Sequence, residues 1–131
     1  FGKKDAQQLS LITQMVKDLF LPINIIPCEI IREVDGLALS SRNVYLDSTQ
    51  RVDALLISKS LYMAGSLIAS GERSVQAVKD KIYEIMKTLD VEYVAIADRD
   101  FNELSFIEPK NTVILVVARF GNTRLLDNIW L

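Results

Sequence analysis

Two short polar segments contain the residue types that could bind an anionic ligand. The first is FGKKDAQQ, in which Gly2, Lys3 and Lys4 precede an expected helix. Lysine ammonium groups and the free amides of a helix N-terminus together favour a bound phosphate. An isolated GKKD, however, fits solvated lysines followed by a helix cap at Asp5 better. Gln8 lies one turn further on and could bind a second ligand, although a solvent-exposed Gln8 fits the spacing equally well.

The second segment is GLALSSRN, which combines two hydroxyl groups and a guanidinium in a stretch rich in turn-forming residues. Arg42 could bind phosphate oxygens through two N–H groups, and Ser40 and Ser41 could donate hydrogen bonds, so the segment could close on a triphosphate. For a bare SSR tripeptide, a turn capped by a serine and an arginine paired with a carboxylate is the favoured interpretation. Neither segment decides the function by itself.

The composition argues against several other kinds of chemistry. The chain has 131 residues, a formal net charge of -2, no histidine and a single cysteine. Without histidine it lacks the usual general base and the commonest transition-metal ligand, so we expect any histidine chemistry to lie elsewhere. Cys28 is expected to be a small buried packing residue in a reduced cytoplasm. The acidic residues Asp98, Asp100 and Glu103 are expected to be solvated loop charges, so no metal ligand is assigned.

Charge and apolar pattern also argue against two classes of partner. The slightly acidic chain has no basic field to attract nucleic acid, and its aromatic residues do not alternate with a basic stripe. The longest apolar run, Val113 to Ala118, has the length of a buried strand rather than the roughly 20 residues of a membrane span. We therefore expect neither a nucleic-acid partner nor a membrane partner.

The elements that must hold the first polar segment resemble the end of an α/β repeat. Residues 5–20 carry apolar side chains at helical spacing, and the β-branched Ile23, Ile25 and Ile26 that follow Pro22 favour a strand. A parallel partner strand is expected just before Phe1, so residues 1–31 are interpreted as the last helix–strand unit of a larger sheet. By itself this unit would leave apolar surface uncovered.

The remaining residues predict a small separate domain. Between Arg32 and Tyr45 the apolar pattern lapses, which indicates a loop and a domain boundary. Two helices and a three-stranded antiparallel sheet are expected to follow, with GNTR as a hairpin turn, so the fold class runs from α/β to α+β. The helices are expected over 47–71, with Val52, Leu55, Leu56, Met63 and Leu67 on its core face, and over 75–90, capped by Ser74; the strands are expected over 91–97, 112–120 and 123–131.

Three motifs, taken in order and at their spacing, resemble the pantothenate synthetase (pantoate-β-alanine ligase) family. They are FGKKDAQQL, REVDGLALSSRNVYL and RLLDN, and together they extend over essentially the whole chain. The resemblance implies that residues 1–31 end an N-terminal Rossmann-like nucleotide-binding domain and that residues 32–131 form a C-terminal lid domain. It also implies ATP and magnesium as cofactors. In that reaction pantoate and ATP form a pantoyl adenylate and pyrophosphate, and β-alanine then displaces AMP to give pantothenate.

The resemblance also implies roles for individual residues, carried over by position. Lys4 would contact phosphate and Asp5 would lie near the ribose, while Gln8 would orient pantoate. The loop of Ser40, Ser41 and Arg42 would grip the phosphates, with Arg42 supplying the charge because the loop contains no lysine. The complete expected ATP site is Gly2, Lys3, Lys4, Asp5, Ile31 through its backbone, Leu39, Ser40, Ser41 and Arg42.

The resemblance places the histidine motif of the family in the N-terminal half. We therefore expect the chain to be a C-terminal part that does not synthesise pantothenate alone, within a cytoplasmic enzyme that forms homodimers mainly through its N-terminal domain. Two alternatives stay open: a non-catalytic nucleotide-binding module that uses the same lysines and arginine, and a purely structural dimerisation domain.

Overall fold

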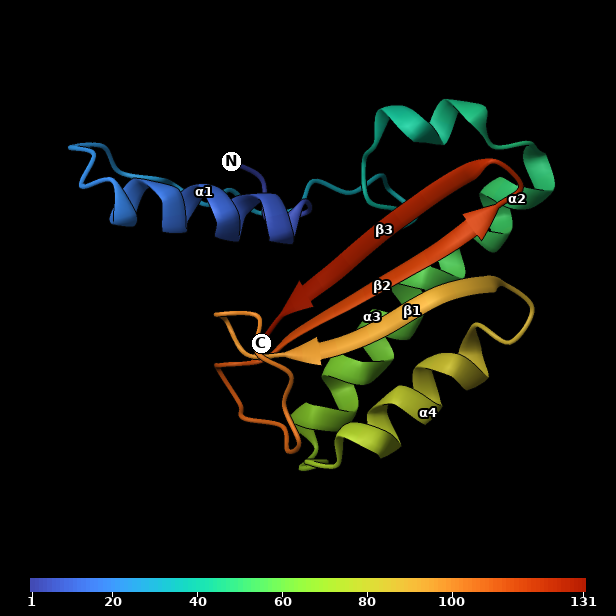
Figure 1. Ribbon diagram of the computed structural model, residues 1–131. Helices are drawn as coiled ribbons and strands as arrows, with labels where there is room; N and C mark the ends of the chain where they lie inside the picture. The colour runs from blue at the N-terminus through green and yellow to red at the C-terminus, as the bar shows by residue number, and fades with distance from the viewer.

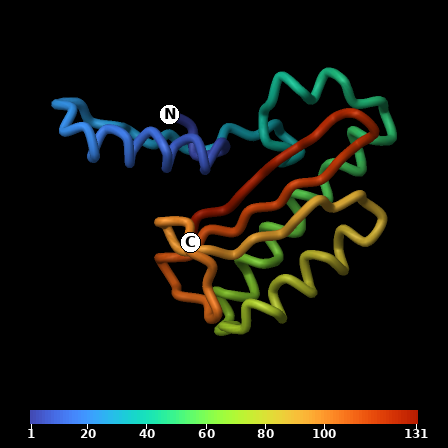
Figure 2. The backbone as a smooth tube through the Cα atoms, in the orientation of Figure 1, coloured from blue at the N-terminus to red at the C-terminus, as the bar shows by residue number.

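A computed structural model describes residues 1–131 and shows a layered α+β unit with one helix projecting from it (Figure 1). The helices α3 and α4 cover one face of a three-stranded sheet, whereas α1 lies apart from these layers in both backbone views (Figures 1 and 2). The elements in chain order are α1 (Ala6–Asp18), the 3-10 helix η1 (Ser41–Tyr45), α2 (Ser48–Asp53), α3 (Leu55–Ala69), α4 (Val75–Ile85), β1 (Asp90–Ala97), β2 (Val113–Phe120) and β3 (Thr123–Trp130).

The sheet is antiparallel with the order β1-β2-β3, as the strand pattern predicts. The hairpin between β2 and β3 closes at the pair Phe120 and Thr123, and Gly121 adopts a φ of +60° there. A side chain at that position would strain the backbone, which is why the GNTR turn begins with glycine.

One main hydrophobic core lies between the helices and the sheet. Ile57 and Leu61 of α3, Val78 and Ile82 of α4 and Val116 of β2 are all almost fully buried in it. The two predicted helix starts are confirmed, because Ser74 Oγ accepts the Ala77 amide and Asp47 forms a capping box with Gln50.

The predicted buried face of the long helix is wrong in part. Val52 and Met63 are 65% and 42% exposed, and Ile57, Leu61 and Ile68 point into the core instead. The helix is apolar on several sides and is interrupted at Ala54, so its sequence does not define a single stripe.

The helical stretch Ser48–Ala69 is also long and apolar enough, by length and composition alone, to cross a membrane. Uninterrupted apolar runs do not reveal it because Ser58, Lys59 and Ser60 divide it. Its residues Leu61 and Ala64 are part of the core, as in the central helix of a compact domain, so this stretch carries no membrane assignment.

The N-terminal segment contains a remnant of parallel pairing. Gly2 and Cys28 form a parallel bridge in which the Lys3 amide donates to the Cys28 carbonyl (2.8 Å) and the Cys28 amide donates to the Phe1 carbonyl (2.8 Å). Residues 23–26, however, form no strand of their own. A strand before Phe1 therefore stays a prediction, which the direction of this bridge favours.

Two local predictions for this segment are wrong. Cys28 is exposed rather than buried, because nothing in the chain packs over the extended segment around it. Asp5 stands at the N-cap position of α1, but its φ of -91° and ψ of 65° are not the extended cap conformation, and its side chain makes no cap hydrogen bond. The exposed apolar residues of α1 and its C-cap include Leu11, Met15 and Leu19.

Candidate functional site

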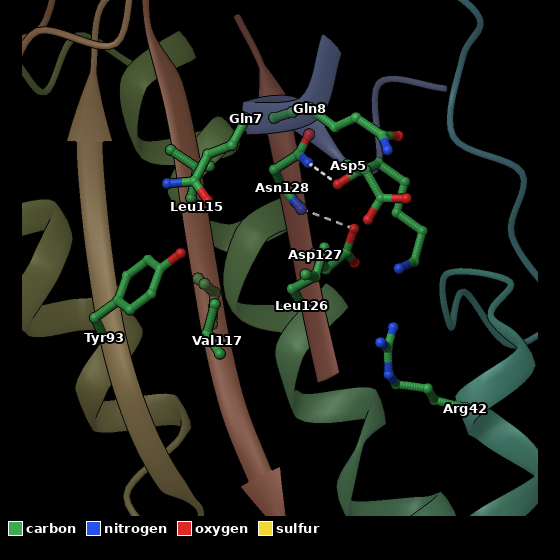
Figure 3. A pocket seen from close by; sticks show the side chains of 13 residues that line it. Asp5, Gln7, Gln8, Arg42, Tyr93, Leu115, Val117, Leu126, Asp127 and Asn128 are labelled. Atoms are coloured by element: carbon green, nitrogen blue, oxygen red, sulfur yellow. Dashed lines mark hydrogen bonds between the residues drawn. The ribbon is translucent and has the colours of Figure 1, made fainter. Parts of the chain in front are cut away.

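A cavity of about 330 Å³ lies between the start of α1, the 3-10 helix η1 and the sheet face that the helices α3 and α4 do not cover. Figure 3 shows Arg42 reaching into it from η1, while Asp5 and Gln8 stand at the α1 side. The floor is formed by side chains of all three strands, including Tyr93, Leu115 and Leu126. Its volume is at the lower end of the range for small-molecule sites, which is roughly 300–1,000 Å³.

The cavity brings together residues from both polar segments. Lys4, Asp5, Gln8 and Arg42 all line it, although α1 and the linker that follows it, residues 19–40, separate the first three from Arg42 in the sequence. Neither Lys4 nor Arg42 forms an ion pair, whereas Arg32, Arg51, Arg119 and Arg124 each pair with a carboxylate. Two carboxylates also line the cavity, but that of Asp127 is paired with Arg32. Lys4 and Arg42 therefore face one hollow with their charges free to bind an anion, beside the Asp5 carboxylate.

The start of α1 adds neutral donors to these two charges. The Asp5 carboxylate accepts no hydrogen bond from the first amides of α1, so these amides stay free to bind a ligand. Such amides favour an anion at the helix N-terminus. Gln8 lies in the first turns of α1 on the wall of the same cavity, where its amide could bind a second ligand.

The loop that carries Arg42 is anchored at its base and open at its tip. Ser40 Oγ accepts the Arg42 amide (3.2 Å), so Ser40 caps η1 and holds the turn that presents Arg42. Asn43 donates to Glu33 Oε1 (3.1 Å) and to the Ala38 carbonyl (3.1 Å), which fixes the loop behind Arg42. Ser40 also lines a small adjoining hollow together with Lys4.

Arg51 reinforces this base through Glu33 and Asp35. Its guanidinium donates to a carboxylate oxygen of each residue at 2.8 Å. The hydrogen bond that Arg51 donates to Glu33 raises the pKa of Arg51, and its contacts with Glu33 and Asp35 outweigh the loss of hydration that opposes the charge.

Other members of the expected ATP site lie outside the cavity. The Lys3 side chain pairs with Glu29 and lines two different hollows, so the structure separates it from Lys4. Ile31 and Leu39 have exposed side chains and meet through their backbones, with the Leu39 amide donating to the Ile31 carbonyl (2.9 Å). Gly2 takes part in the parallel bridge, and Ser41 is exposed at the start of η1.

Three residues without an expected role connect the Lys3–Lys4 backbone to the segment that leads to Arg42. Asn128 on β3 donates to the Lys3 carbonyl (2.9 Å) and the Lys4 carbonyl (2.8 Å). Its neighbour Asp127 accepts two hydrogen bonds from Arg32, at 2.6 and 3.0 Å. Burial of the Arg32 guanidinium opposes its charge, but the hydrogen bond and attraction of Asp127 outweigh this and raise the pKa of Arg32. A signal was present, because adjacent polar residues interrupt an otherwise apolar strand in RLLDN.

No cluster of three or more histidine, cysteine, aspartate or glutamate side chains could hold a metal ion. Asp98 instead accepts hydrogen bonds from the amides of Asp100 and Asn102 and from the Asn102 side chain, which lower the pKa of Asp98. These contacts organise a turn.

Comparison with known proteins gives one family. The family model described as pantoate-beta-alanine ligase matches residues 1–130. The chain is 82% identical to the pantothenate synthetase of Aliarcobacter butzleri over 131 residues, which are 100% of this chain and 48% of that protein. It is 54% identical to the pantothenate synthetase of Helicobacter pylori (strain 26695) over 130 residues, which are 99% of this chain and 47% of that protein.

Solved structures agree with this assignment. The pantothenate synthetase of Thermus thermophilus superposes with a TM-score of 0.92 at 33% identity, over 99% of this chain and 48% of that chain. A pantoate-beta-alanine ligase from Francisella tularensis, complexed with beta-gamma ATP and beta-alanine, gives a TM-score of 0.63 at 30% identity, over 98% of this chain and 41% of that one. The chain thus spans about half the length of the relatives it matches, in their C-terminal part. With the family model matching almost every residue, the chain belongs to the pantoate-beta-alanine ligase family.

Proposed function

We propose that this chain supplies the C-terminal part of an ATP-dependent ligase that condenses pantoate with β-alanine to form pantothenate, AMP and pyrophosphate. The observation that carries the proposal is the meeting of Lys4 and Arg42, both without an acidic partner, on one cavity beside a helix N-terminus. The Francisella tularensis relative, complexed with beta-gamma ATP and beta-alanine, supports ATP and β-alanine as ligands of the family fold.

The roles of the residues follow from their places around the cavity. Lys4, Arg42 and the first amides of α1 bind the phosphates, because they present positive charge and free donors to the same hollow. Asp5 accepts from the ribose hydroxyls at the edge of the cavity. Gln8, one turn further along α1, hydrogen-bonds pantoate.

The loop before α2 completes the nucleotide site in this proposal. Ser40 and Ser41 donate to phosphate oxygens beside Arg42, and Leu39 and the Ile31 backbone contact the nucleotide at the base of the loop. The open tip of this loop leaves it free to approach the ligand, because its anchors lie behind Arg42. Gly2 allows the backbone to come close to the ligand, and Lys3 contributes its backbone alone, since its side chain pairs with Glu29.

The chemistry has two displacements. A pantoate carboxylate oxygen attacks the α-phosphorus of ATP, the bond to the β-phosphate oxygen breaks, and pyrophosphate leaves with that electron pair. The β-alanine amine then attacks the acyl carbon of the pantoyl adenylate, AMP leaves with the electrons of the acyl–oxygen bond, and the amine loses a proton. Lys4 and Arg42 lower both barriers by stabilising the negative charge that builds up on phosphate oxygens.

In this proposal, the remaining part of the active site lies outside this chain. A cavity of about 330 Å³ is small for a nucleotide and two further substrates, so a Rossmann-like N-terminal half supplies the other wall and the histidine chemistry. Residues 1–31 complete that half, and residues 32–131 form the lid. Magnesium would be held mainly by the nucleotide phosphates, whose negative charge it would offset. The whole enzyme is placed in the cytoplasm as a homodimer.

The test compares the chain alone with the enzyme that joins it to its N-terminal half. Release of AMP and pyrophosphate from pantoate, β-alanine and ATP is measured for both proteins. The joined enzyme is expected to turn over, and the chain alone is not. Steady turnover by the chain alone would overturn the division of labour, and a joined enzyme that binds ATP without releasing AMP would support a nucleotide-binding module instead.

A further inference from the structure

Two segments lead to the cavity: the Lys3–Lys4 backbone before α1, and residues 32–42, which end at Arg42. We call them the two arms of the cavity, and both bind to the same place on β3. Asn128 is 1% exposed and holds the Lys3–Lys4 backbone, while Asp127 is 4% exposed and holds Arg32 at the start of the linker. The two residues are adjacent on β3, and Figure 3 shows them side by side on the wall of the cavity. Two adjacent residues therefore fix how far apart the two arms lie.

The contact of Asn128 is the only one that satisfies its two acceptors. Within the chain, the Lys3 and Lys4 carbonyls accept hydrogen bonds from no other group. These hydrogen bonds are partly buried, where a carbonyl without a donor is costly, so the Asn128 side chain helps to define the path of the backbone into α1. The direction of the Lys4 side chain and of the first amides of α1 follows from that path.

The contact of Asp127 defines the other arm in the same way. Arg32 donates two hydrogen bonds to Asp127 and further ones to the Gly36 carbonyl (3.1 Å) and the Asn128 carbonyl (3.4 Å). The guanidinium also lies 5.4 Å from the centre of the Tyr62 ring, which fixes its plane. Arg32 thus closes the turn at Gly36, whose φ of +96° reverses the chain toward the loop of Arg42.

We propose that Asp127 and Asn128 are positioning residues that set the distance between Lys4 and Arg42, and that they act on phosphate binding without touching the nucleotide. This inference rests on the proposed function. Burial of β3 alone does not explain the polar residues of RLLDN. An apolar residue at position 128 would fill the strand but would leave the Lys3 and Lys4 carbonyls without a donor.

Asn128→Ala tests the proposal in the enzyme that contains this chain with its N-terminal half. Asn111→Ala is the matched control, since the Asn111 side chain donates only to Glu108 in an exposed turn. Loss of two hydrogen bonds is expected to lower kcat/KM for ATP by about tenfold to thirtyfold, with the control within twofold of the parent enzyme. Asn128→Ala is expected to lower kcat/KM for ATP by a smaller factor in the Lys4→Ala background than in the parent enzyme, because part of its effect acts through the placement of Lys4.

Hydrogen exchange provides a readout that a general loss of packing would not imitate. In Asn128→Ala, amide exchange is expected to quicken in residues 1–9 and to stay unchanged in residues 113–118 of the core strand β2. Faster exchange in both segments, an unfolded variant, or an unchanged kcat/KM would each overturn the proposal. If the parent enzyme releases no AMP, the proposed function fails, and the exchange pattern still decides whether Asn128 positions the backbone.

Discussion

Removal of the Arg42 guanidinium is the most direct perturbation of the proposed phosphate site. Arg42 lines the cavity, forms no ion pair and contacts its own loop only through its backbone amide, which donates to Ser40. Its side chain therefore does little for the fold. Arg42→Ala is expected to leave the free energy of unfolding unchanged within about 0.5 kcal/mol, as for other exposed surface positions.

The magnitude for catalysis follows from one charged hydrogen-bonding group. A hydrogen bond to a charged partner contributes about 1.5–3 kcal/mol net, which corresponds to a fall of about tenfold to 150-fold in kcat/KM for ATP. Arg42→Lys is expected to lie between the parent and Arg42→Ala, because it keeps the charge and loses the two-pronged geometry of the guanidinium. Higher salt should narrow the difference between parent and variant.

The assay is AMP release at varied ATP with saturating pantoate and β-alanine, in the enzyme that joins this chain to its N-terminal half. Arg99→Ala is a suitable control, because Arg99 is also exposed and donates only to the Leu131 carbonyl at the opposite end of β3 from the hairpin near Arg42. The two variants remove the same charge from different ends of the sheet.

The reasoning is refuted by either of two results. If Arg42→Ala and Arg99→Ala lower kcat/KM for ATP equally, the effect comes from net charge and not from a phosphate contact. If Arg42→Ala lowers the free energy of unfolding by several kcal/mol, the Arg42 side chain makes a stabilising contact that the structure does not show.

Three further expectations concern stability. Ile82→Ala removes a fully buried side chain from the core and is expected to lower the free energy of unfolding by about 2–5 kcal/mol in chemical denaturation. Arg32→Leu leaves the buried carboxylate of Asp127 without its partner and is expected to cost about 3 kcal/mol, with Arg32→Lys less harmful. The hydrogen bond from Arg124 lowers the pKa of Glu92 below its ordinary 4.5. This contact therefore stabilises the fold above pH 4.5, and the stabilisation is lost as the pH falls through the lowered pKa. Glu92→Gln should make the free energy of unfolding less dependent on pH in this range, as measured by acid unfolding.

The sequence predicted those parts of the fold that local rules determine. The helix starts at Asp47 and Ser74 were predictable because both carry a side-chain acceptor at the cap position, and the hairpin was predictable from its glycine. The buried face of α3 was not, since apolar residues surround the helix and only its partners choose among them. Cys28 was misjudged because burial depends on what packs over a segment, and its own sequence does not contain that information.

The candidate site was predictable to a similar extent. Lys4 and Arg42 were chosen by residue type and motif, and the structure places both on one cavity. The resemblance favoured Lys4 over Lys3 as the phosphate contact, whereas residue type alone could not, because adjacent residues before a helix point in directions that depend on the backbone path. RLLDN marks Asn128 as unusual for a strand, but the sequence does not reveal its partners, because its contacts reach across more than a hundred residues of chain to two carbonyls that carry no side-chain signature.

The place of these contacts on β3 has its own physical logic. β3 is an edge strand of the sheet, and an unprotected edge offers free backbone groups that invite pairing with other chains. The linker covers part of this edge, since Arg32 donates to the Asn128 carbonyl and Arg32 bridges Ala38 in the same segment. One set of contacts therefore protects the edge and fixes both cationic arms. Because the segments that carry Lys4 and Arg42 share this anchor, they should keep their relative placement while it is intact, and a change at Asp127 or Asn128 should alter phosphate binding before it alters the core.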